Sequence, residues 1–217
     1  MTNASFVRLE EAIVDELFPE VDVDLRSGRH IDRNDADRYT FLVEAQVQLE
    51  AFYRRYGCEL VHSTDGYFYL VPTGDRLGRR HLSLGEMLIG QTLALAYLEP
   101  TTVSTGGIIG REQVLSRLAG LVGERELVQA LNPRRKKYDE RVAQETVRVE
   151  IGKALRGLTA LGFIEFIDAD HVKLRAPILR FADSVRSLED PAAALARLVS
   201  EGKAVTERQD EEVEDEA

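Results

Sequence analysis

A three-residue pattern occurs twice in this chain of 217 residues, and the two copies lie 105 positions apart. In each copy a glycine ends a long stretch of helical periodicity, an aspartate follows eight residues later and a proline fifteen residues later. Two short apolar runs lie between the glycine and the proline, which predicts a helix followed by a two-stranded hairpin. The chain therefore contains two related units. The two copies are Gly57, Asp65, Pro72 and Gly162, Asp170, Pro177.

The first copy carries further local signals. Apolar spacing predicts helices over 5–17 and 34–56, separated by a polar, turn-rich segment over 19–33. Strands are predicted over 58–63 and 67–71, and the Asp-Gly pair at 65–66 predicts a two-residue type I′ turn with positive φ at both central positions.

The second copy begins near Ser83, whose hydroxyl and the Glu86 carboxylate fit a capping box. Helices are expected over 84–98, 111–121, 124–131 and 139–161, followed by strands over 163–167 and 171–175. The segment 99–110 is expected to be a loop, and Pro177 is expected to open a short helix at its favoured first position.

A helix that feeds a hairpin at the end of a small helical unit is the layout of a winged-helix domain. The sequence therefore predicts a mainly α protein with short β-hairpins and tandem winged-helix domains. The expected division begins with an N-terminal winged-helix domain over 1–75, a linker over 76–82 and a C-terminal winged-helix domain over 83–188. A C-terminal helix over 189–206 and an acidic disordered tail over 207–217 follow.

The net charge of −10 is unevenly distributed along the chain. The stretch 207–216 holds seven acids and one arginine, whereas the stretch 134–156 holds eight bases and four acids. A globally acidic protein is repelled by nucleic acid, but a local excess of bases keeps contact with phosphates possible.

The predicted helix over 139–161 has one apolar side and one basic side. The following hairpin is expected to alternate, with Val172 and Leu174 inward and the two intervening bases outward. In a winged helix the third helix enters a DNA groove and the wing contacts the adjacent backbone. These positions are the candidate phosphate contacts, with a solvated basic face as the alternative: Arg148, Lys153, Arg156, Lys173 and Arg175. Few asparagines or glutamines lie on this face, which argues against base-specific readout.

The first predicted hairpin has three aromatic residues in a row: Tyr67, Phe68 and Tyr69. Since side chains alternate along a strand, one face of the hairpin is expected to be aromatic. A protein interface is the functional interpretation of this face, and coverage by the chain's own linker is the alternative.

The sequence offers no pattern typical of an active site, a metal site or a bound cofactor. Its four histidines are scattered, and Cys58, its one cysteine, is expected to be a buried residue of a strand. Asp32 to Asp37 fits a calcium loop poorly, so helix capping is the better interpretation. No secretory signal or membrane-spanning stretch is predicted, and the low cysteine content is typical of a reducing cytoplasm.

Several segments resemble the MukE family, the accessory subunits of bacterial MukBEF condensins. The resemblance covers about residues 6–205 and is carried by LFPEVDVDLRSGRHID, FLVEAQVQLEAFYRRYGCEL, GYFYLVP, LGFIEF and VKLRAPILRFADSV. It implies a tandem winged-helix protein that forms a homodimer and binds the kleisin MukF. The complex then docks on the SMC ATPase MukB and helps to load and hold duplex DNA during chromosome segregation.

The resemblance also implies a protein that is not itself an enzyme and that acts in the cytoplasm at the nucleoid. Two other functions are open on the sequence. A winged-helix transcription regulator would bind a palindromic site on its own, which the scarcity of base-reading residues and the acidic balance disfavour. An enzyme with an unrecognised site would be stabilised by a saturating ligand.

Overall fold

The computed structural model describes residues 6–122 and 140–182, which form two compact units. One unit comprises the chain up to His81 together with the short segments 160–163 and 175–177. The other comprises the remaining residues from Leu82 onwards. The predicted helix over 124–131, the C-terminal helix and the acidic tail lie outside the described residues.

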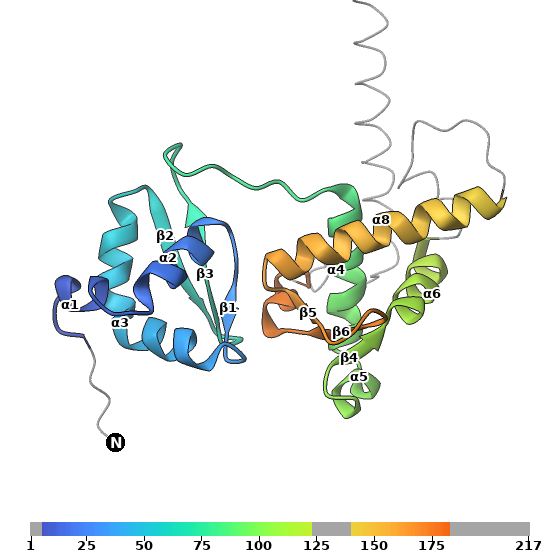
Figure 1. Ribbon diagram of the computed structural model, residues 1–217, viewed down its shortest axis with the longest axis horizontal. Coiled ribbons are helices and arrows are strands. Elements are labelled where there is room, and N and C mark those ends of the chain that lie inside the picture. The colour runs from blue at the N-terminus through green and yellow to red at the C-terminus, as the bar shows by residue number, and fades with distance from the viewer. Residues whose placement is uncertain (1–5, 123–139, 183–217) are drawn as a thin grey trace, which may run out of the picture. The chain divides into compact units, whose positions relative to one another are not determined.

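The first unit contains three helices and one three-stranded sheet (Figure 1). Its three strands form an antiparallel sheet in the order β1-β3-β2, and α3 packs against β2. The core lies between the sheet and the helices and includes Leu42, Leu49 and Phe68, which are all fully buried. The elements are α1 (Leu9–Ile13), α2 (Phe18–Arg26), β1 (Ile31–Asp32), α3 (Ala36–Arg54), β2 (Cys58–Ser63) and β3 (Tyr67–Pro72).

The helix α2 corrects the expectation of a turn-rich segment over 19–33. Pro19 stands in the first turn of this helix, where its missing N–H and fixed φ are tolerated. Val21 and Leu25, four residues apart, are both buried on one side of the helix. Pro19 therefore marks a helix start within the segment predicted to be turn-rich, and the helix predicted over 5–17 is limited to the short α1.

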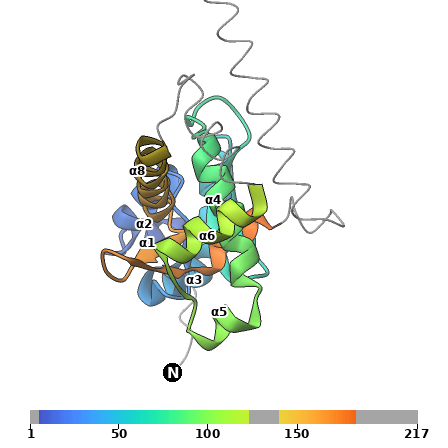
Figure 2. The same cartoon turned by 90° about the vertical axis from the view of Figure 1, so that its right-hand side faces the viewer.

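The second unit repeats the strand order of the first and has an additional helix, α6, between its first strand and its long helix. Its strands form an antiparallel sheet in the order β4-β6-β5. Figure 2 shows α4, α5 and α6 of this unit with α8 seen nearly end-on. The elements are α4 (Leu84–Tyr97), α5 (Pro100–Ser104), β4 (Ile108–Gly110), α6 (Arg111–Val122), α8 (Glu140–Ala160), β5 (Ile164–Phe166), β6 (His171–Leu174) and the 3₁₀ helix η1 (Ala176–Phe181). The expected loop over 99–110 thus contains α5 and β4.

The capping box at the start of α4 is confirmed. The Ser83 hydroxyl accepts a hydrogen bond from the Glu86 N–H, and the Glu86 carboxylate accepts one from the Ser83 N–H. Glu86 also lies against α8, since a Cβ at Gly157 would be 1.9 Å from its Oε1. The glycine therefore allows α8 to pass close to the start of α4.

Both repeated glycines end their helices as predicted, with φ of 70° at Gly57 and 76° at Gly162. The predicted type I′ turn of the first hairpin is wrong, because no residue other than glycine has positive φ in the described chain. Ser63 pairs with Tyr67, which leaves a three-residue loop that ends in Gly66 with φ 84°. A three-residue loop with a left-handed glycine is the next commonest hairpin solution.

Candidate nucleic-acid interface

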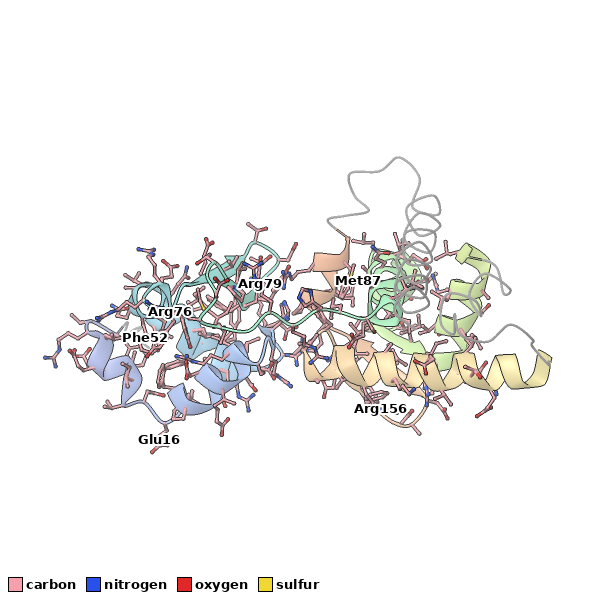
Figure 3. The ribbon with its side chains drawn as sticks, turned by 90° about the horizontal axis from the view of Figure 1, so that it is seen from above. Glu16, Phe52, Arg76, Arg79, Met87 and Arg156 are labelled. Atoms are coloured by element: carbon pink, nitrogen blue, oxygen red, sulfur yellow. The ribbon has the colours of Figure 1, made fainter. Side chains whose placement is uncertain are left out.

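Helix α8 separates an apolar side from a basic side, as its sequence predicts. The side chains turned towards the interior are at most 5 % exposed: Val147, Ile151, Ala154, Leu155 and Leu158. Arg148, Lys153 and Arg156 are exposed, and Arg156 projects outward from the helix in Figure 3. Burial of the apolar stripe therefore fixes which way the three cations point.

Two of these cations have an acidic neighbour. Arg148 Nη2 lies 3.3 Å from Glu112 Oε1, and Lys153 Nζ lies 2.6 Å from Glu150 Oε1. The side chains of both cations are more than half exposed, so these ion pairs contribute little, on the order of 0–1 kcal/mol each. A phosphate group can therefore replace the Glu112 or Glu150 carboxylate at a small cost in free energy.

Arg111, the first residue of α6, belongs to the same surface and was not anticipated from the sequence. A Cβ at Gly152 of α8 would meet Arg111 Nη2 at 3.0 Å and Arg156 Nη1 at 3.7 Å, so the two guanidinium groups are neighbours. Arg111 Nη1 also donates to the Ala169 carbonyl in the β5–β6 turn, 3.2 Å away. Arg111 therefore connects the basic face of α8 with the wing.

The wing offers less positive charge than predicted. Val172 and Leu174 are buried as expected, and Lys173 is half-buried opposite Glu165 on β5. The turn itself carries acids, and the Asp168 carboxylate accepts hydrogen bonds from the Asp170 and His171 N–H groups. The hydrogen bond from the Asp170 N–H has the largest effect and lowers the pKa of Asp168. The contact with the His171 ring and the bond from the His171 N–H lower it further, so the tip of the wing is anionic at neutral pH.

Arg175 does not lie on the basic surface, and the prediction that it points outward is wrong. It is 3 % exposed, and its Nη2 bonds Asp32 Oδ1 at 2.5 Å and also Asp35 Oδ2. Strand β6 ends at Leu174, so the alternation of side chains no longer applies to the next residue. No part of its guanidinium is available for a phosphate.

This ion pair is buried in the first unit, which includes both partners. Burial alone would raise the pKa of Asp32, but hydrogen bonds and charge from Arg175 hold that pKa below its usual value. The Asp32 carboxylate also accepts hydrogen bonds from Asn34 N–H at 2.9 Å and Ala176 N–H at 3.2 Å. Asp32 thus acts as a buried anchor, and the N-cap residue of α3 is Asp35.

The aromatic residues of the first hairpin are largely enclosed. Phe68 is fully buried, with its ring centroid 4.0 Å from that of His62, and Tyr67 is 3 % exposed. Tyr69 is half-buried and stacks on His30, whose ring also packs against Phe163 at 4.4 Å. Tyr67 and Phe68 therefore present no open aromatic face, because Tyr67 lies against the His30 ring and Phe68 lies against the rings of His62 and Tyr39. Leu77 of the predicted linker also packs against the core cluster that contains Phe68.

Among the described residues, no group of three or more His, Cys, Asp or Glu side chains is placed to hold a metal ion. Within the same part of the chain, no helix has the length and apolar character needed to cross a membrane.

Comparison with known proteins gives consistent matches. The model of the MukE-like family matches residues 6–217. The chromosome partition protein MukE of Actinobacillus succinogenes is 38% identical over 202 residues, which cover 92% of this chain and 82% of that protein. The protein of the same name from Histophilus somni is 37% identical over 204 residues, with the same two coverages. That from Yersinia pseudotuberculosis is 35% identical over 204 residues, covering 92% of this chain and 86% of the relative.

Proposed function

Because this chain belongs to the MukE-like family, we propose that it is a non-enzymatic accessory subunit of a MukBEF-type SMC complex that acts in chromosome partition. The relatives, of which this chain covers 82% of the length, are named chromosome partition proteins. The protein works in the cytoplasm at the nucleoid and needs no cofactor of its own.

Both units are winged-helix domains. The support is the shared order of elements, in which a long helix leads through a left-handed glycine into a hairpin and a third short strand joins the sheet. The chain forms a homodimer, binds the kleisin MukF and reaches the SMC ATPase MukB through the kleisin. Its part in the complex is to scaffold these proteins around duplex DNA.

The basic face of α8 contacts the DNA backbone in the assembled complex. The observation that supports this most is the outward side of α8, where Arg148, Lys153 and Arg156 are exposed while the opposite stripe is held in the core. Arg111 adds a fourth cation beside Arg156. Lys173 contributes from the wing, whereas Arg175 does not.

The contact is independent of base sequence. Gln144 is the one glutamine in the sequence of α8, which has no asparagine, and these are the residues that read adenine most directly. Arginine and lysine on an exposed face bind phosphates without reading sequence. The net charge of −10 weakens DNA binding by the free protein, so retention depends on the partners that place this face against DNA.

The test is the double substitution Arg148→Glu with Arg156→Glu in the assembled complex. DNA retention after a high-salt wash should fall at least about tenfold, because two phosphate contacts are replaced by two repulsive charges. Dimer mass and kleisin binding should be unchanged. The matched control is Arg8→Glu with Arg180→Glu, which changes the net charge equally outside α8.

Retention at the wild-type level in the α8 variant would show that this face does not hold DNA. Purification of the tagged protein from its native cell tests the assembly itself. A kleisin and a large SMC ATPase should accompany it. Recovery of a lone dimer bound to one defined DNA sequence would instead support the transcription regulator.

A further inference from the structure

The end of α3 brings together arginines that are far apart in the sequence. Arg54 and Arg55 end the helix, and the segment 73–81 that follows β3 returns to the same place. The Thr73 and Gly74 N–H groups donate to the Gly57 carbonyl at 2.8 and 3.1 Å.

Arg76 fixes the next part of this segment. Its Nη1 donates to the Arg55 carbonyl at 2.8 Å, which satisfies one of the unpaired carbonyls at the helix end. A guanidinium has five N–H donors, so one bond leaves Arg76 free to bind an anion as well. Arg79 follows three residues later and cannot lie more than about 11 Å further along the chain. Figure 3 labels Arg76 and Arg79 on the segment that leaves β3.

The charge of these guanidinium groups is open to solvent. Arg54, Arg55, Arg76 and Arg79 are all exposed. Within the part of the chain that the structure describes, none of the four forms an ion pair, although Arg148 and Lys153 on α8 each have one. Asp75 is the one acid in the segment 73–81. The end of α3 therefore carries exposed positive charge that no ion pair among the described residues balances.

We propose that the arginine cluster Arg54, Arg55, Arg76 and Arg79 is a second contact surface for the phosphate backbone of duplex DNA. The inference rests on the proposed contact of this protein with DNA, but it does not depend on the assignment of that contact to α8. Each planar guanidinium fork can bind two phosphate oxygens at once, which a lysine cannot do.

The surroundings of the cluster favour a phosphate backbone over a protein partner. Among the described residues beside Arg54 and Arg55, Tyr56 is the one exposed large apolar side chain, and the Arg26 guanidinium already lies over its ring, 4.5 Å from the centroid. Leu77, between Arg76 and Arg79, packs against the core of the first unit. A protein interface usually has an apolar centre, whereas the middle of this surface consists of arginine side chains.

The charge spacing also fits DNA. Duplex DNA carries one negative charge for about every 1.7 Å of axis, so a cluster of this reach meets several phosphates whatever the sequence. Binding through it should be non-specific and should fall steeply with salt, by about 0.9 in log K per unit log salt for each phosphate contact.

The experiment uses the full chain and a fluorescent mixed-sequence duplex, with the dissociation constant measured by anisotropy between about 50 and 200 mM KCl. The test variant is Arg54→Gln with Arg55→Gln and Arg79→Gln. It leaves Arg76 in place because that side chain holds the segment on the helix end. The matched control, Arg8→Gln with Arg33→Gln and Arg180→Gln, removes the same charge from exposed positions elsewhere.

The test variant should lower the salt slope by about 2 to 3 and raise the dissociation constant at low salt at least about tenfold, while the control changes both far less. Equal losses in test and control variants would mean that only net charge matters, and would overturn the inference. An unchanged slope with loss of a co-purifying protein would assign the cluster to an acidic protein partner and overturn it too.

A third variant, Arg148→Gln with Arg156→Gln, separates this inference from the proposed function. If only that variant loses affinity, the arginine cluster is not a DNA surface and the assignment to α8 stands. If only the cluster variant loses affinity, the second surface is supported and α8 does not contribute to binding by the free chain. Absence of binding by the wild-type chain at low salt overturns the inference but not the proposed function, which concerns the assembled complex.

Discussion

The central strands of the two sheets, β3 and β6, occupy the same place in the repeat but bury different faces. On β3, the neighbouring residues Tyr67 and Phe68 are both buried, so the strand is covered on both sides. On β6, Val172 is buried and Lys173 is half-buried, so one side remains partly open. The same backbone layout therefore leaves a usable outer surface in one unit and not in the other.

The difference shows that function in a repeated fold depends on which faces remain open. The open basic surface of the first unit is the end of α3, and that of the second unit is the outward side of α8. In neither unit is the hairpin the main basic surface. The long helices differ in the same way. The outward side of α3 carries Val43 and Val47, whereas that of α8 carries Arg148, Lys153 and Arg156. Fold similarity alone would have assigned both helices the same role.

Substitution at the equivalent positions 68 and 173 should give the largest contrast between the two strands. Phe68→Ala should lower the free energy of unfolding by about 3–5 kcal/mol, because it removes a fully buried ring and leaves a cavity. Lys173→Ala should change it by no more than about 0.5 kcal/mol. Urea unfolding followed by circular dichroism measures both. Similar losses in the two variants would contradict the difference in burial.

A second contrast lies two residues further along the chain in each repeat, where Leu70 on β3 and Arg175, just after β6, are both buried. Leu70 needs no partner, but the Arg175 guanidinium depends on Asp32. Asp32→Ala should lower the free energy of unfolding by about 3–5 kcal/mol, because it leaves a buried charge short of its partner. Asp37→Ala, an exposed acid in the first turn of α3, is the control and should cost less than about 1 kcal/mol. A loss below about 1 kcal/mol for Asp32→Ala would show that the pair is not held as described.

The same ion pair should appear in the pH dependence of stability. The pKa of Asp32 is below its usual value in the folded protein, so its contribution is complete above the unfolded pKa near 3.8 and is lost as the pH falls through the folded pKa. The difference in unfolding free energy between wild type and Asp32→Asn should be constant above about pH 5 and should shrink below that. A difference that grows on acidification would contradict the lowered pKa.

The repeated glycines give a contrast of intermediate size. Both have positive φ, which costs an alanine about 1–2 kcal/mol in either position. A Cβ at Gly57 would meet the backbone of Gly74 at an ordinary 3.6 Å, whereas a Cβ at Gly162 would lie 2.4 Å from the His30 carbonyl oxygen. Gly162→Ala should therefore cost about twice as much as Gly57→Ala or more, as measured by thermal unfolding. Equal losses would mean that the backbone around His30 can move aside.

Local features were predictable from the sequence because they depend on neighbouring residues. The left-handed Gly57 and Gly162, the Ser83 capping box and the two faces of α8 are signals of this kind. They suffice for a mainly helical chain with two hairpins. The type I′ turn failed although it is also local, since a three-residue loop uses the same Asp-Gly pair.

Features that depend on distant residues were not predictable. Arg175 is paired with Asp32, Arg111 approaches Arg156 because position 152 has no side chain, and Arg76 reaches the Arg55 carbonyl. Periodicity gives the direction of a side chain relative to its own element but not which element it meets. Most of the candidate site on α8 could therefore be predicted, and the arginine cluster could not.

The smallest expected effect concerns the outward side of α3, which is the counterpart of the basic side of α8. Val47 is 74 % exposed, so Val47→Lys should change the free energy of unfolding by no more than about 0.5 kcal/mol. Urea unfolding and sedimentation velocity, with Gln46→Lys as a control in the same turn, measure stability and self-association together. If Val47→Lys alone dissociates a dimer, this apolar side is covered by a second copy of the chain. Both long helices would then face a partner. The partner of α3 would be an apolar protein surface, and the partner of α8 would be the phosphate backbone of DNA.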